Sequence, residues 1–408
     1  MVGVSAQTVF DRLAGPQSLN RMLYDAATAA RQKARGAGVD KQNAFTQSWL
    51  FTGPPGSGRS VAAKAFAAAL VCSNPEVVGC GRCEDCRLAL VDAHGDIVHI
   101  IPHELTISVD RMREVIGSAA TQPTVANWRV IIIEDADRLS DGAANALLKT
   151  VEEPAERTII ILCSPSTDPH DIAITLRSRC RHVYVPTPSA ESVTRILMAE
   201  GGISEDAARL AAASSGGHIG RARHLAHNQA AQIRRANILN LAELIYHGDQ
   251  AFRTVNTLVK GIEAESRDAL AEVEKAESDK LMVSLGMGTR GKGAQKLLRG
   301  TTGQLKDLEK TQERRRTRFL RDALDLSLVD LAGIYRDALL ISSGAGISLT
   351  HPDFEGLSRE LAERVGNEGL VACLDAISVC RESFGFNVRP IVAMDALVGR
   401  LRKAYRVS

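Results

Sequence analysis

One segment near the N-terminus restricts the possible folds more than any other. Residues 53–60 read Gly-Pro-Pro-Gly-Ser-Gly-Arg-Ser and follow a short apolar run, 49–52. The pattern G-x-x-x-x-G-K-[ST] places glycine N–H groups around phosphates between a strand and a helix, and its lysine contacts the outer phosphates. Here an arginine replaces the lysine. We therefore expect a phosphate-binding loop with altered chemistry, formed by Gly53, Gly56, Gly58, Arg59 and Ser60.

Arginine keeps the positive charge of lysine, but its planar guanidinium is wider and sits on a longer stem. Arg59 therefore leaves open whether a nucleotide still binds, whereas Ser60 still offers a hydroxyl to magnesium.

A pair of acidic residues follows a second apolar run. Glu134 and Asp135 come directly after Val130–Ile133. Enzymes that hydrolyse nucleotides need one carboxylate for magnesium and another group that orients the attacking water, and the usual order here is Asp then Glu. The reversed order shortens the second side chain by one methylene, and a displacement of about 1 Å can lower a rate roughly 100-fold. The simpler alternative is that these residues only mark the end of a strand.

Four of the eight cysteines are clustered. Cys72, Cys80, Cys83 and Cys86 offer four thiolates, which suit a tetrahedral and structural zinc ion. An iron–sulfur run would continue with a further cysteine, but Leu90 stands near that position. Four free thiols packed in a core are the other possibility, and the polar residues Arg82, Glu84 and Asp85 argue against it.

The order of apolar and periodic segments predicts the architecture. Strands are expected at 49–52, 96–101, 130–133, 158–163 and 182–185, and helices at 61–71, 109–119 and 143–151. Alternating strands and helices predict a doubly wound α/β domain with a parallel sheet. Helices are then expected from Ser189, from Ser204 and near Ile219, and 3.6-residue patterns dominate from about residue 236 on.

The glycine-rich stretch 286–303 is expected to be a flexible loop, within an insert at about 280–312. It precedes a basic run, Arg314-Arg315-Arg316 with Arg318. A solvated loop and a contact with a partner or nucleic acid both fit this composition.

Composition excludes some classes of protein. The net charge is +2, so any contact with nucleic acid needs a local basic patch. We find no stretch of roughly 18–20 apolar residues and no secretory signal. We therefore expect a cytoplasmic protein without a membrane anchor.

Together these residues resemble the clamp-loader branch of the AAA+ ATPases. Residues 147–154, Leu-Leu-Lys-Thr-Val-Glu-Glu-Pro, look like the branch's signature helix, and Ser178-Arg179-Cys180 matches its Ser-Arg-Cys motif. The cysteine module at 72–86 is similar to the zinc module of bacterial clamp-loader subunits. The resemblance is close over about 230 residues and holds only in outline beyond them. It implies an AAA+ domain at 1–187, a helical lid at 188–235 and an all-α collar at 236–408.

The resemblance also carries expectations about activity. The branch's motor subunits have the loop lysine, an Asp-Glu pair and a lid arginine, whereas this chain has Arg59, Glu134-Asp135 and Gly220, with Arg221 one place later. In these three departures from the motor pattern the chain resembles the branch's stator subunit, which has little or no ATPase activity and no polymerase site of its own. Zinc would be structural, and binding of ATP with magnesium weak or absent.

By spacing alone, three arginines at 177, 179 and 181 fit a solvated basic edge or a finger presented to phosphate. The resemblance implies that Arg179 is the finger that reaches a neighbour's ATP site, and that Ser166 occupies a sensor position. It implies tau/gamma motor subunits and a delta subunit as partners, with contact to the sliding clamp and primer–template DNA through the assembled ring. An active ATPase of the same branch, and a zinc-containing nucleic-acid-binding protein outside any ring, are the alternatives.

Overall fold

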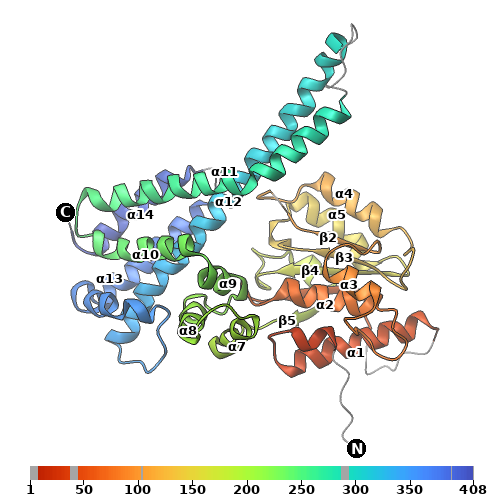
Figure 1. Cartoon of the computed structure of the whole chain (residues 1–408), viewed down its shortest axis with the longest axis horizontal. Helices are drawn as coiled ribbons and strands as arrows, with labels where there is room; N and C mark the ends of the chain where they lie inside the picture. The colour runs from red at the N-terminus through yellow and green to blue at the C-terminus, as the bar shows by residue number, and fades with distance from the viewer. Residues whose placement is uncertain (1–7, 37–44, 103, 286–293, 387, 408) are drawn as a thin grey trace, which may run out of the picture. The chain divides into compact units, whose positions relative to one another are not determined.

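The computed structural model of the chain divides into two compact units (Figure 1). It describes all residues except 1–7, 37–44, 103, 286–293, 387 and 408. One unit contains residues 1–205 and 215–223, and the other contains 206–214 and 224–408. The expected division at 187 and 235 into domain, lid and collar stays a prediction.

The first unit is built on a five-stranded sheet with the strand order β2-β3-β4-β1-β5. Every neighbouring pair of strands is parallel. This confirms the predicted parallel α/β sheet, with strand ends that differ from the expected ones by at most one residue. The strands are β1 (Ser48–Thr52), β2 (Ile97–Ile100), β3 (Arg129–Ile133), β4 (Thr158–Ser164) and β5 (Arg181–Tyr184).

Alternate residues of the strands enter two separate cores, as the two-residue period of a strand requires. Trp49 and Phe51 pack with Phe66 and the alanines of α1 (Gln17–Ala34) and α2 (Arg59–Val71). Leu50 and Ile131 enter the other core with residues of α4 (Val109–Ala119), α5 (Asp141–Glu152) and the short α6 (Ile174–Arg177). Figure 1 shows α1 and α2 on one face of the sheet and α4 and α5 on the other.

Serine caps fix where several helices begin. Ser108, Ser140 and Ser189 each accept a hydrogen bond from the backbone N–H three residues later, at the starts of α4, α5 and α7 (Ala190–Glu200). Helices α8 (Glu205–Ser214) and α9 (Ile219–His227) follow α7. Gly216 and Gly217 separate α8 from α9 with φ angles of +60° and +86°. The three helices expected between residues 189 and 227 are therefore present.

The second unit is helical around a core of leucine, isoleucine and tyrosine side chains. Its remaining helices are α10 (Gln229–Leu244), α11 (Asp249–Ser284), α12 (Ala294–Ser342), α13 (Glu355–Ser383) and α14 (Pro390–Ala404). Among the described residues, no helix has the length and apolar character that a membrane crossing needs.

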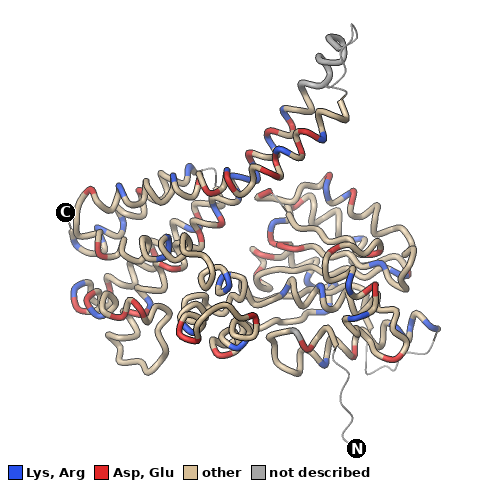
Figure 2. The backbone as a smooth tube through the Cα atoms, in the orientation of Figure 1, with Lys and Arg blue, Asp and Glu red and all other residues tan. Residues whose placement is uncertain are grey.

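The prediction of a flexible loop at 286–303 is wrong for residues 294–303, the part of this stretch that the structure describes. Residues 294–303 belong to α12, residues 280–284 end α11, and 286–293 lie outside the described part of the chain. The two helices run side by side as a long arm on which basic and acidic residues are interspersed (Figure 2). Arg316 pairs with Glu274, and Arg315 donates to both carboxylate oxygens of Glu277 at 3.1 and 2.8 Å. These pairs between the helices oppose the cost of about 1 kcal/mol for each helical glycine.

Candidate nucleotide site and metal centre

The loop that follows β1 has the backbone conformation of an anion-binding turn. Gly56 and Gly58 adopt left-handed φ angles of +83° and +92°, which glycine reaches at no steric cost. A Cβ atom on Gly53 would lie 2.1 Å from the carbonyl oxygen of Val185. Gly58 is also the N-cap of α2, so N–H groups at the positive end of this helix border the loop. The expected strand, loop and helix are all present.

Arg59 turns its side chain back onto this loop. Its Nη1 atom donates to the carbonyl oxygen of Gly53 at 2.7 Å. The imidazole of His218 lies against the loop at Gly56, because a Cβ on Gly56 would lie 2.1 Å from its Cγ. Burial lowers the pKa of His218, and the charges of Arg221 and Arg59 lower it further. The Arg59 guanidinium therefore contacts the loop at Gly53, and the His218 imidazole lies against it at Gly56.

Glu134, at the end of β3, is buried and has hydrogen bonds on both carboxylate oxygens. Ser60 Oγ donates to Oε2 at 2.7 Å, and His99 Nε2 lies 3.1 Å from Oε1. The other ring nitrogen of His99 lies 2.8 Å from Asp92, which pairs with Lys64 at 2.7 Å. Burial opposes a charge on His99, but its bonds to Glu134 and Asp92 outweigh burial and raise its pKa.

Asp135 does not share this environment. Its backbone is left-handed, with φ of 47°, and its carboxylate lies 3.5 Å from Arg138 Nε. Burial raises the pKa of nearby Asp137 to about 6, and the charge of Asp135 raises it further. The structure therefore brings Ser60 and Glu134 together and directs Asp135 toward Arg138.

Ser166 lies near the start of the loop, since Gly53 N donates to the carbonyl oxygen of Pro165 at 3.2 Å. Its hydroxyl donates to Asp171 at 2.6 Å and accepts from Asp168 N at 2.9 Å. These contacts hold Ser166 within its own turn, and the sensor role stays a prediction.

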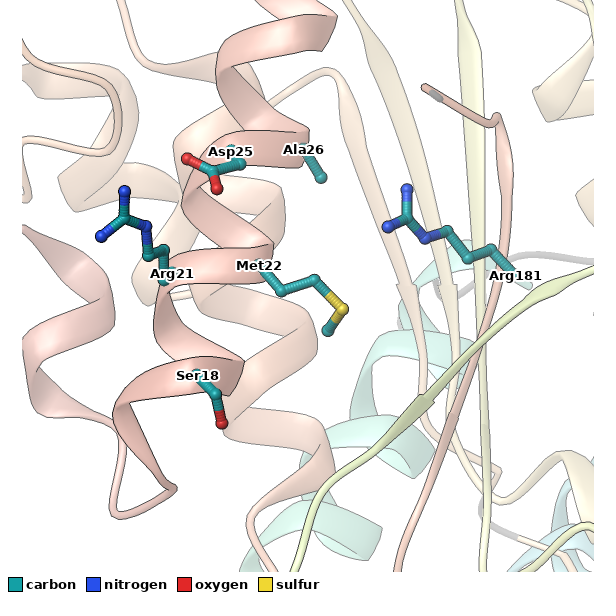
Figure 3. Close-up of a pocket in the computed structure, with 6 residues that line it drawn as sticks. All are labelled: Ser18, Arg21, Met22, Asp25, Ala26 and Arg181. Carbon is teal, nitrogen blue, oxygen red and sulfur yellow. The ribbon is translucent and has the colours of Figure 1, made fainter. Parts of the chain in front are cut away.

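The three arginines of the predicted basic edge separate in space. Arg177 donates to the carbonyl oxygen of Thr167, whereas Arg179 Nε donates to Glu152 at 3.0 Å. Arg181 lies over the Trp49 ring, 5.1 Å from its centroid, and extends toward Met22 (Figure 3). It lines one side of a 310 Å³ hollow, whose other lining residues are Ser18, Arg21, Met22, Asp25 and Ala26.

The sheet register places Arg179 far from its own phosphate loop. In the β1–β5 pairing, Trp49 lies opposite Arg181, and Thr52 lies opposite Tyr184. The loop begins just beyond Thr52, whereas Arg179 precedes the first residue of β5. At about 3.3 Å per strand residue, the four steps from Trp49 to Gly53 alone span about 13 Å. Arg179 and the loop therefore lie at opposite ends of the sheet.

The four clustered cysteines converge on one point. The sulfur atoms of Cys72, Cys80, Cys83 and Cys86 all lie within 4.8 Å of one another, and those of Cys72 and Cys83 are 3.9 Å apart. Zinc–sulfur bonds of about 2.3 Å in a tetrahedron put sulfur atoms roughly 3.8 Å apart, so the cluster fits such an ion. A hydrogen bond from Cys86 lowers the pKa of Cys72 to about 4, which makes Cys72 the readiest thiolate.

Neighbouring elements hold the cluster in place. Cys83 N and Cys86 N donate to sulfur atoms, and Cys86 is in the first turn of α3 (Glu84–Leu90). Arg31 of α1 donates to the carbonyl oxygens of Asn74 and Cys72 at 2.7 and 3.0 Å. A metal here would therefore fix the turn against α1 and α2, while the four sulfurs leave no ligand position for a substrate.

Comparison with known proteins identifies the first unit. The family described as "DNA polymerase III, delta subunit" matches residues 37–189. DNA polymerase III subunit delta' of Escherichia coli is 33% identical over 198 residues, which cover 48% of this chain and 59% of that protein. Subunit tau of Bacillus subtilis is 38% identical over 141 residues, which cover 34% of this chain and 24% of that protein.

Residues 37–189 belong to the clamp-loader family of AAA+ proteins.

The matched relatives extend well beyond the region that this chain shares with them, since it spans 24% of one and 59% of the other. The solved structure of a DNA polymerase III gamma subunit-related protein from Thermotoga maritima covers 92% of this chain and 99% of its own. Its TM-score is 0.40 at 16% identity. Both delta' and tau subunits match, so membership in the clamp-loader family leaves the type of subunit undecided.

In this clamp-loader unit, two motifs that are far apart in sequence meet. Glu152 ends α5, the helix that carries the predicted signature at 147–154, and holds Arg179 of the Ser-Arg-Cys motif. Sequence reasoning missed His99, which contacts Glu134 from β2, and Asp92, which contacts His99 from the turn before that strand. The sequence did show a histidine, His99, within a predicted apolar strand. Its contact with Glu134 could not be predicted, because that contact depends on the order of the strands in the sheet.

Proposed function

We propose that this chain is the delta-prime, or stator, subunit of a DNA polymerase III clamp loader. In this role it supports ATP-driven loading of the sliding clamp onto primed DNA. The tau/gamma motor subunits hydrolyse ATP, and this chain supplies Arg179 in trans to the neighbouring site. The helices from residue 236 on would form the collar that joins motor and delta subunits in the ring, and residues 188–235 would form the lid. DNA and the clamp are then reached through the assembled ring.

The position of Arg179 is the observation that carries this proposal. The residue lies at the opposite end of the sheet from its own phosphate loop, and its side chain is 35% exposed. Glu152 and the carbonyl oxygen of Thr175 hold the guanidinium at 3.0 Å each. An arginine fixed at this edge can serve a phosphate only on another molecule that docks there.

The chemistry of such a finger is electrostatic. A guanidinium placed against the transferred phosphoryl group stabilises the charge of the transition state, and removing it lowers the rate of that site by roughly 10³–10⁵. Glu152 would keep Arg179 oriented until the neighbour's phosphate takes over as its anionic partner, because arginine forms charge-assisted, bidentate contacts with carboxylate and phosphate alike.

The departures in this chain's own site support the stator over the motor. Arg59 contacts the Gly53 carbonyl, and Asp135 faces Arg138, where the reaction would need a water-orienting group. Gly220 stands where a motor has its lid arginine. Zinc held by Cys72, Cys80, Cys83 and Cys86 would have a structural role.

The test is a matched pair of substitutions in the complete reconstituted complex. Arg179→Ala should leave assembly intact and greatly reduce DNA-stimulated ATP hydrolysis. The ATP site of the neighbouring motor subunit, which Arg179 would reach, should lose most of its turnover. Arg177→Ala removes a neighbouring arginine that donates to the Thr167 carbonyl and should leave hydrolysis near the unsubstituted level. Normal turnover with Arg179→Ala would refute the finger role.

An active motor subunit is the second candidate, because subunit tau of Bacillus subtilis matches at 38% identity. This candidate predicts steady ATP hydrolysis by the isolated chain, which falls when Ser60 or Glu134 is replaced. Absence of hydrolysis by the isolated chain, together with the Arg179 effect in the complex, favours the stator.

A further inference from the structure

We infer that His218 is a phosphate-binding residue, whose imidazole Nε2–H donates to a polyphosphate held in the loop 53–60. The inference deepens the proposed function, since it rests on residues 53–60 being a nucleotide site. It is independent of the role of Arg179 at the other end of the sheet.

The loop contains a buried hydroxyl group without a partner. Ser57 is only 4% exposed, and its Oγ points back across the loop, 2.6 Å from the place that a Cβ on Gly53 would take. Within the described part of the chain, this Oγ has no hydrogen-bond partner. Buried polar groups are nearly always hydrogen-bonded, so an unpaired hydroxyl beside the N-terminus of α2 indicates a ligand that carries oxygen atoms.

His218 approaches this loop with one edge of its ring. A Cβ on Gly56 would lie 2.1 Å from the Cγ of His218 and 2.5 Å from its Cδ2, the carbon bonded to Nε2. The opposite edge lies against α9, since a Cβ on Gly220 would lie 3.3 Å from Cε1 and 3.6 Å from Nδ1. Nε2 is therefore the ring nitrogen on the side of the loop.

The other ring nitrogen caps α9. His218 directly precedes Ile219, the first residue of this helix, and its carbonyl oxygen accepts from Ala222 N at 2.9 Å. Its Nδ1 accepts from Arg221 N at 3.2 Å, as the side chain of an N-cap does. A ring whose Nδ1 accepts a hydrogen bond carries its proton on Nε2. The nitrogen on the side of the loop is therefore a donor.

The cap also brings a second helix N-terminus to the loop. Helix α2 has 13 residues and begins at Arg59, while α9 has 9 residues and begins at Ile219. Each N-terminus presents N–H groups and a partial positive charge, which attract anions. The Arg59 guanidinium, which contacts the Gly53 carbonyl, adds further donors. Phosphate oxygens only accept hydrogen bonds, so they match this set of donors, and His218 joins it from α9.

Two substitutions of His218 separate the donor from the cap. Asparagine places an amide oxygen near the position of Nδ1, whereas glutamine places an amide NH₂ near that of Nε2. The assay is calorimetric titration of the full chain with ADP in a buffer that contains magnesium. His218→Asn should weaken ADP binding about tenfold or more, as the loss of a hydrogen bond to a charged group does. His218→Gln should keep the affinity within about threefold of the unsubstituted chain.

Stability measurements and a control variant exclude a purely structural effect. The melting temperature, followed by tryptophan fluorescence, should change little in His218→Asn, because asparagine is a strong N-cap, and should fall in His218→Gln, which lacks the cap. His224→Asn, at an exposed position of α9, should bind ADP like the unsubstituted chain.

Several outcomes would overturn the inference. Equal ADP affinity in His218→Asn and the unsubstituted chain would do so, and so would tighter binding, since the ring would then obstruct the loop. Weak binding in both variants would mean that the ring acts through its packing. A lack of ADP binding by the unsubstituted chain would also refute it. If His218→Asn does not fold, His218→Ser, another N-cap, takes its place, and if His218→Gln does not fold, the asparagine variant decides alone.

This result is separable from the clamp-loader proposal. Unchanged ADP binding in His218→Asn together with a strong Arg179→Ala effect would remove only the role of His218. Weaker ADP binding in His218→Asn with normal turnover in Arg179→Ala would remove only the proposed function.

Discussion

Replacing Asp96 with asparagine should destabilise the first unit by an amount that follows from its hydrogen bonds. Asp96 is fully buried just before β2. Its Oδ1 accepts from Thr124 N and Thr124 Oγ at 2.7 and 3.0 Å, and its Oδ2 accepts from Val125 N and Ala126 N, both at 2.8 Å. One carboxylate thus anchors the turn that leads into β3, the strand that directly precedes Glu134.

Asparagine can accept on one side only, and its NH₂ group must then face N–H donors. If the NH₂ group replaces Oδ1, the backbone N–H of Thr124 has no acceptor. If it replaces Oδ2, the backbone N–H groups of both Val125 and Ala126 have none. Each buried donor without a partner costs roughly 1–3 kcal/mol, and the charge assistance is lost as well. We therefore expect Asp96→Asn to lower the free energy of unfolding by about 2–4 kcal/mol.

Both tryptophans of the chain, Trp49 and Trp128, are buried in the first unit, so fluorescence during urea unfolding reports on that unit. Asp110→Asn is the matched control, because Asp110 is 84% exposed in its pair with Arg113 and its loss should cost about 0.5 kcal/mol or less. If Asp96→Asn unfolds at the same urea concentration as this control, the hydrogen-bond reasoning is wrong.

The penalty should also depend on pH. Burial opposes the charge on Asp96, but hydrogen bonds from Ala126, Thr124 and Val125 outweigh burial and lower its pKa below the ordinary 3.8. A lowered pKa in the folded state stabilises the fold above the ordinary value, and this contribution is lost as the pH falls through the folded-state pKa. The difference between Asp96→Asn and the unsubstituted chain should therefore be full at neutral pH and shrink in acid below pH 3.8.

Two further predictions concern the metal centre and a glycine. Purified protein should contain zinc. Both the Cys83→Ser substitution and treatment with a chelator should remove the ion and lower the melting temperature of the first unit. Metal analysis that finds no zinc in the purified protein would exclude the site. Gly217→Ala should destabilise more than Gly201→Ala in the same fluorescence assay. Both positions have φ near +80°, but a Cβ on Gly217 would lie 2.1 Å from Thr187 Cγ2, and one on Gly201 meets nothing within 4 Å; equal effects would contradict this difference.

Much of the first unit could be predicted because local signals agree with the fold. The apolar run at 130–133, the glycines of the loop and the serine caps each determine a strand, a turn or a helix start from nearby residues alone. The cysteine spacing likewise predicted a convergence that the structure confirms, with all four sulfurs within 4.8 Å.

The remaining features depend on contacts between distant residues. The bond from His99 to Glu134 requires β2 and β3 to be neighbours, which the sequence order of strands does not determine. The hydroxyl of Ser166 donates to Asp171, and no sequence pattern predicts which of its polar neighbours it will contact. Helix α12 continues through Gly300 and Gly303 although both glycines predict a loop, and the ion pairs that join α12 to α11 farther along are contacts that the local sequence does not reveal.

The arm formed by α11 and α12 has polar residues at its seam, and this limits how its length can change. Gln312 donates to the Glu274 carbonyl at 3.1 Å, beside the pairs of Arg315 with Glu277 and Arg316 with Glu274. Each partner matches only the group opposite it, so a slip of one helix by a turn would bury unmatched charge. A shorter arm would therefore require the deletion of the same number of whole helical turns from α11 and from α12.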